Sequence, residues 1–89
     1  MKERTLGGLA KRMSELATVS EELPAALRDI RYDEEDPQSI KSALEKIKQR
    51  VDEEASKYPD NTHVQNFTQK IKHTQSVILS EKADVARKK

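Results

Sequence analysis

The first third of the chain carries an unbroken heptad of mostly apolar positions. The spacing alternates between three and four residues from Leu6 to Ile30, and seven of the eight positions are apolar. Because an α-helix places residues three and four apart on one face, this pattern predicts a long helix with one face buried against other helices. The eight positions are Leu6, Leu9, Met13, Leu16, Ser20, Leu23, Leu27 and Ile30.

The first predicted helix spans residues 3–32 and has two weak points, Gly7-Gly8 near its start and Pro24 in its second half. Pro24 removes a backbone hydrogen bond to the carbonyl of Ser20. Thr18 followed three residues later by Glu21 resembles a capping box, which would allow a second helix to start near Ser20. The heptad phase passes through this region without a skip. We therefore predict one long helix that is kinked between Ser20 and Pro24.

Two more helices follow, each after a short polar connection. Asp36 is a suitable N-cap and Pro37 is favoured at the first helical position, so the second predicted helix spans residues 37–58. Pro59 ends it, and the third predicted helix spans residues 62–86. The apolar track of the second helix is Ile40, Leu44, Ile47, Val51, Ala55 and Tyr58, and the weaker track of the third is Val64, Phe67, Ile71, Thr74, Ile78, Glu81 and Val85.

Connections this short force successive helices to run antiparallel. The sequence therefore predicts a single all-α domain, a three-helix up-down-up antiparallel bundle with a long first helix. At 1.5 Å per residue, the first helix is about 45 Å long and the second about 32 Å, so the second cannot cover the first. We expect the first two or three turns of the first helix to be uncovered, with Leu6, Leu9 and Met13 on them.

The composition predicts a thin core. Only 34% of the residues are hydrophobic and 37% are charged, which is typical of a highly solvated domain or of one that borrows part of its core from a partner. The absence of cysteine excludes disulfides and thiolate metal sites. No apolar run approaches the roughly 20 residues of a transmembrane helix, and residues 1–4 lack the apolar stretch of a secretory signal. We expect an intracellular protein, cytoplasmic or nuclear.

The charges are distributed unevenly, with basic ends around an acidic middle. Residues 1–12 carry a net charge of +3, residues 13–60 of −6 and residues 61–89 of +4. Basic side chains near the C-terminus are candidate phosphate contacts, so a small nucleic-acid-associated protein is the alternative function. The isoelectric point of about 8.0 and the lack of interleaved aromatic residues weigh against it. The candidate contacts are Lys82, Arg87, Lys88 and Lys89.

Catalysis and metal binding have little support in the sequence. There is no thiol, no glycine-rich phosphate loop and no recognisable catalytic triad, so we predict no enzyme activity and no cofactor. His63 and His73 lie ten residues apart, which separates them by about 15 Å along one helix and prevents them from sharing a metal. The carboxylates of residues 33–36 lack a glycine-bearing calcium loop and are expected to stay solvated near the Arg87–Lys89 tail.

The remaining class of function is protein–protein interaction, as an adaptor or assembly subunit. Beside the apolar seam of the first helix runs a line of small residues that includes Ala10, and small residues let another helix approach closely. A wide face on a stretch that the second helix cannot reach favours an external occupant, which is either a protein partner or a second copy of the chain. The predicted docking residues are Leu6, Leu9, Ala10 and Met13.

Overall fold

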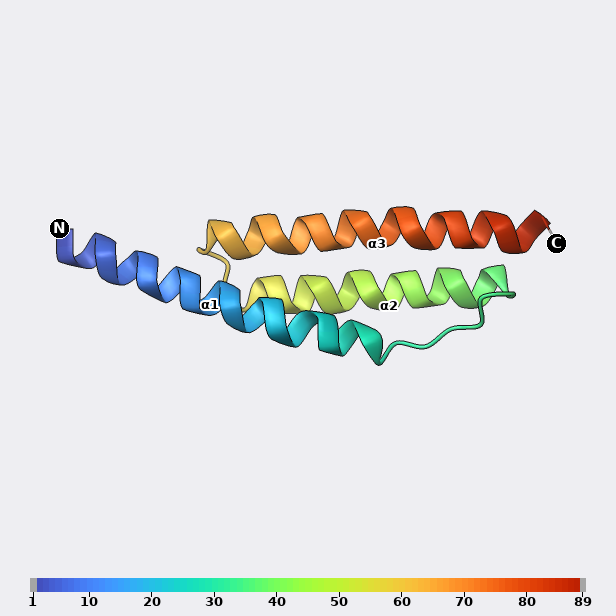
Figure 1. Cartoon of the computed structure of the whole chain (residues 1–89), viewed down its shortest axis with the longest axis horizontal. Coiled ribbons are helices and arrows are strands. Elements are labelled where there is room, and N and C mark those ends of the chain that lie inside the picture. The colour runs from blue at the N-terminus through green and yellow to red at the C-terminus, as the bar shows by residue number, and fades with distance from the viewer. Residues whose placement is uncertain (1, 89) are drawn as a thin grey trace.

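Three helices form nearly all of the part of the chain that the structure describes. The structure is a computed structural model that describes the backbone of residues 2–88 and the side chains of residues 8–88. The helices are α1 (Lys2–Arg28), α2 (Pro37–Ser56) and α3 (Thr62–Lys88), and residues 2–88 contain no strand. Successive helices run antiparallel, so that the chain goes up, down and up (Figure 1). The predicted all-α, up-down-up bundle is confirmed.

The first helix is continuous through the predicted weak point at Pro24. Pro24 lies inside α1, and no second helix starts near Ser20. The hydroxyl of Thr18 donates to the carbonyl of Ser14 (3.1 Å) and that of Ser20 to the carbonyl of Ala17 (2.8 Å). These bonds point back into the preceding turn, so Thr18 does not cap a new helix.

The first helix ends at Arg28, before the end predicted at Tyr32. The N–H groups of Asp29 and Ile30 still donate to carbonyls three residues earlier (3.2 and 3.1 Å), which tightens the last turn. The chain then runs extended to the start of α2, which lies well beyond the end of α1 (Figure 1). An extended chain covers about 3.3 Å per residue against 1.5 Å in a helix, so residues 29–36 reach α2 only by leaving the helical conformation.

The second helix begins as the sequence predicts. The Asp36 carboxylate accepts the N–H of Gln38 (3.0 Å), and Pro37 occupies the first helical position. At the other end, the side-chain amide of Gln65 donates to the carbonyl of Ala55 in the last turn of α2 (2.9 Å) and to that of Tyr58 in the following connection (3.0 Å). Both ends of α2 are therefore satisfied by side chains close to them in the sequence.

The core lies between α2 and α3, and α1 joins it only through its second half. Val19 and Leu23 of α1 are fully buried. The first half of α1 projects past the end of the α2–α3 hairpin (Figure 1). Three helices therefore overlap along only part of the molecule. The buried apolar cluster is Val19, Leu23, Ile40, Ala43, Ile47, Val51, Val64, Leu79 and Ala86.

The buried face of the second half of α3 differs from the predicted one. Ile78 and Val85 lie on the predicted track, but they are 40% and 58% exposed. Their neighbours Leu79 and Ala86 are buried in their place. Because α1 ends at Arg28, this part of α3 has no third helix beside it, and only its side towards α2 is covered.

None of the described helices is long and apolar enough to cross a membrane.

A pair of leucine substitutions in α1 tests this placement of the core. We expect Leu23→Ala to lower the free energy of unfolding by about 2–5 kcal/mol, because it leaves a cavity in the three-helix overlap. Leu9→Ala removes the same atoms from a side chain that is 47% exposed, and we expect a change below about 1 kcal/mol. Chemical denaturation followed by circular dichroism measures both. Equal losses would contradict the projection of the first half of α1.

Candidate functional site

Asn61 fixes the point at which α1 leaves the hairpin. Its side chain is buried in the turn between α2 and α3. The amide nitrogen donates to the Arg12 carbonyl and to the Glu15 carboxylate, both at 2.9 Å. The amide oxygen accepts the N–H of Val64 (3.1 Å) and so caps α3. The residues of α1 before Arg12 consequently lie beyond the hairpin turn.

Leu9 and Ala10, two of the predicted docking residues, lie on this projecting stretch, and Met13 lies at its base, directly after Arg12. Leu9 is 47% exposed, Met13 is 46% exposed, and Ala10 is also exposed. The side chain of Leu6, the fourth predicted residue, lies outside the described part of the chain. Leu9 and Met13 are one helical turn apart, so they share a face. The projecting stretch and its base therefore present two large apolar side chains with a small residue beside them.

Lys82, one of the predicted phosphate contacts, is engaged within the chain. Its ammonium group donates to the carboxylate of Glu34 (2.9 Å) and to the hydroxyl of Tyr32 (3.2 Å). It also lies 5.6 Å from the centre of the Tyr32 ring. The hydrogen bonds to Glu34 and Tyr32 raise the pKa of Lys82 above its ordinary value. Lys82 therefore links α3 to the extended connection between α1 and α2.

The other predicted phosphate contacts that the structure describes lie in the last turn of α3. Arg87 pairs with Asp84 on its own helix, Lys88 is exposed, and Lys89 lies outside the described residues. Among the described side chains, Lys82 makes an ion pair with Glu34 of the acidic connection, and the expected contact of the Arg87–Lys89 tail with that connection stays a prediction. The basic side chains of this end are thus partly neutralised by acids of the same chain.

His63 and His73 are both exposed. Among the described side chains, no group of three or more histidine, cysteine, aspartate or glutamate residues could hold a metal ion.

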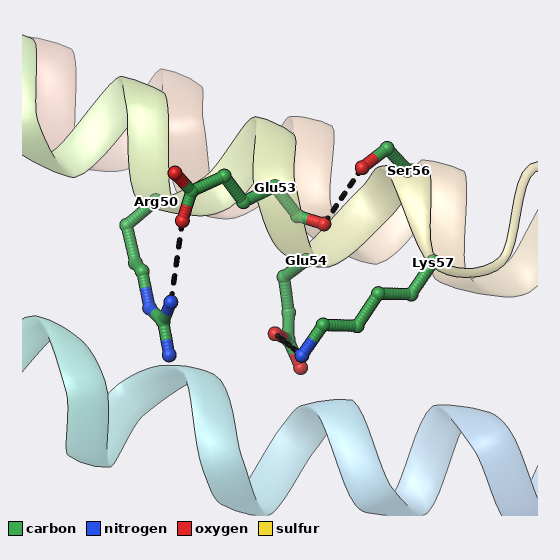
Figure 2. Close-up of polar contacts among 5 residues, drawn as sticks. All are labelled: Arg50, Glu53, Glu54, Ser56 and Lys57. Carbon is green, nitrogen blue, oxygen red and sulfur yellow. Dashed lines mark hydrogen bonds and ion pairs between the residues drawn. The ribbon is translucent and has the colours of Figure 1, made fainter.

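A buried acid, Glu54, is the polar feature that the sequence reasoning missed. Glu54 lies on α2, is 2% exposed and points towards α1 (Figure 2). One carboxylate oxygen accepts from Lys57 at 2.9 Å, and the other has no hydrogen-bond partner in the described chain. The hydrogen bond from Lys57 to Glu54 raises the pKa of that lysine above its ordinary value.

A signal for Glu54 was present in the heptad of α2. It lies three residues after Val51 and four before Tyr58, so a strict heptad passes through Glu54 as well as past its neighbour Ala55, which the predicted track includes. The position of Glu54 under α1 makes it a polar group within the contact between α1 and the hairpin.

Two substitutions separate two contributions to the free energy of unfolding: the cost of burying the Glu54 carboxylate and the stabilisation from its ion pair with Lys57. We expect Glu54→Met to raise the free energy of unfolding by about 1–3 kcal/mol, because it removes a desolvated carboxylate oxygen that has no partner. Lys57→Met should lower the denaturation midpoint, since it leaves the carboxylate buried without its cation. Urea unfolding of both variants measures these changes. A lower midpoint for Glu54→Met would show that the carboxylate makes a net favourable contact.

One comparison with known proteins identifies a family. The chain matches the YuaX family over residues 4–89. It has no significant match among curated proteins or among solved structures. The description of the family gives no activity, ligand or partner. Because the match covers nearly the whole chain, the protein belongs to the YuaX family.

Proposed function

We propose that this protein is a non-enzymatic protein–protein interaction module, an adaptor or assembly subunit, that docks an apolar helix on the first half of α1. The docking residues are Leu6, Leu9, Ala10 and Met13. The observation that carries the proposal is the exposure of Leu9 and Met13, 47% and 46%, on and at the base of the stretch of α1 that extends beyond the hairpin.

The projecting stretch gains more from a partner than an ordinary surface helix does. Isolated helices shorter than about 12–15 residues are marginal in water, and most helical stability in proteins comes from packing an apolar face. Covering the exposed parts of Leu9 and Met13 removes apolar surface from water, and because each side chain is already about half buried it gains about half of the roughly 1.5–3 kcal/mol of full burial. Ala10 lies beside them and allows the partner helix to approach closely.

Salt dependence separates this proposal from nucleic-acid binding. Apolar docking on α1 depends weakly on salt, whereas binding through phosphate contacts weakens steeply as salt rises. The pairing of Lys82 with Glu34 and of Arg87 with Asp84 favours the docking proposal, because these cations already have acidic partners.

A double substitution on α1 tests the proposed docking surface. We expect Leu9→Glu/Met13→Glu to abolish association while the denaturation midpoint stays close to that of the parent, because neither side chain is buried in the core. The control is Asn66→Glu/Gln69→Glu, which adds the same charge at exposed positions of α3. Sedimentation velocity and pull-down from cell extract measure association, and circular dichroism measures folding.

Two outcomes of this test would contradict the proposal. If the double variant folds and retains the self-association and bound proteins of the parent, the docking surface is elsewhere. If it unfolds while the control stays folded, Leu9 and Met13 contribute to the core of the chain.

A further inference from the structure

The second half of α3 carries an exposed apolar surface that α1 does not reach. Ile78 and Val85 are 40% and 58% exposed and lie seven residues apart, on one face of the helix. They line a shallow groove of about 540 Å³ between α3 and the extended connection. We call this feature the α3 groove. Its lining residues are Glu34, Glu35, Ile78, Glu81, Lys82 and Val85.

The projecting end of α1 complements the α3 groove in charge. We call residues 2–13 the α1 tip. Among its described side chains, the tip carries the basic residues Lys11 and Arg12 and no acid, together with the exposed apolar residues Leu9 and Met13. The groove carries three glutamates and one lysine around Ile78 and Val85. Each surface is therefore apolar at its centre, with net positive charge on the tip and net negative charge in the groove.

The two surfaces also correspond in length. Both arise because α1 is displaced along the hairpin, so that it extends past the turn at one end and stops short at the other. α1 passes the hairpin turn at Arg12, so the part of α1 beyond the turn is about 16 Å long at 1.5 Å per residue. At its other end α1 stops at Arg28, which shares a pocket with Gln75 of α3. The part of α3 beyond that level is about 20 Å long. The uncovered part of α3 is therefore similar in length to the projecting part of α1.

We infer that the occupant of the α1 tip is a second copy of this chain, with the tip of each copy docked in the α3 groove of the other. The inference rests on the proposed function, since it uses the same tip residues. The tip and the groove lie at opposite ends of a molecule 60 Å long, so one chain cannot bring them together. An antiparallel pair related by a two-fold axis makes both contacts at once and leaves no end open.

Charge reversal at each end tests this pairing. The tip variant is Lys11→Glu/Arg12→Glu, and the groove variant is Glu35→Lys/Glu81→Lys; all four side chains are exposed. In a pair of two identical variant chains, the tip and the groove that meet carry charges of the same sign at both contacts. We therefore expect the self-association of each variant alone to weaken at least about tenfold. In an equal mixture, each contact again joins opposite charges, and we expect a mixed pair with nearly the parent affinity.

The measurement is sedimentation equilibrium of the parent, of each variant and of their mixture. The matched control is Glu45→Lys/Glu53→Lys on α2, which reverses the same number of acids away from the α3 groove and should leave association unchanged. A parent that stays monomeric over the whole concentration range would overturn the inference. Steady growth beyond two copies would overturn the closed pair. A mixture no tighter than its components would also overturn it.

The failure of this inference can be told from the failure of the proposed function. If Leu9→Glu/Met13→Glu abolishes association while the groove variant associates like the parent, the α1 tip is a docking surface for a different occupant. The proposed function then stands and the second-copy assignment is wrong. If neither variant changes association, both are wrong.

Discussion

The arrangement of the three helices depends on one buried side-chain amide. Asn61 bonds to Arg12 and Glu15 of α1 at 2.9 Å and caps α3 through Val64. Because a buried amide that loses its partners costs free energy, this contact favours one axial position of α1 over its neighbours. With α1 held there, its first turns pass the hairpin, and its last turn stops short of the start of α2. The extended connection and the uncovered half of α3 both follow from that displacement.

The sequence predicts those parts of the fold that depend on local interactions. Heptad spacing identifies three helices. Asp36 and Pro37 determine where α2 starts through contacts within its first turn. The end of α1 and the buried face of α3 depend on the axial position of α1, which is set by a contact between residues 49 apart in sequence. Ile78 and Leu79 are adjacent and both apolar, so periodicity alone does not determine which of them is buried.

The candidate docking site is predictable to the same extent. Exposure of Leu9 and Met13 follows from comparing helix lengths, because a longer helix must extend past a shorter partner. The α3 groove does not follow from that comparison, since it exists only because α1 ends early. Glu54 lies beside Ala55 of the apolar track of α2, where the choice between burial and exposure depends on whether α1 covers that position.

The contact between α1 and the hairpin is thin compared with the core of the hairpin itself. It contains two fully buried apolar side chains, Val19 and Leu23, and it also buries the partly unsatisfied carboxylate of Glu54. An occupant on the α1 tip, as proposed, would bind the state in which α1 is helical and docked, so it would stabilise that state by mass action. Because the tip and the docked half belong to one continuous helix, ordering the first lowers the entropy cost of holding the second. The proposed docking at the exposed end would therefore be coupled through α1 to packing in the core.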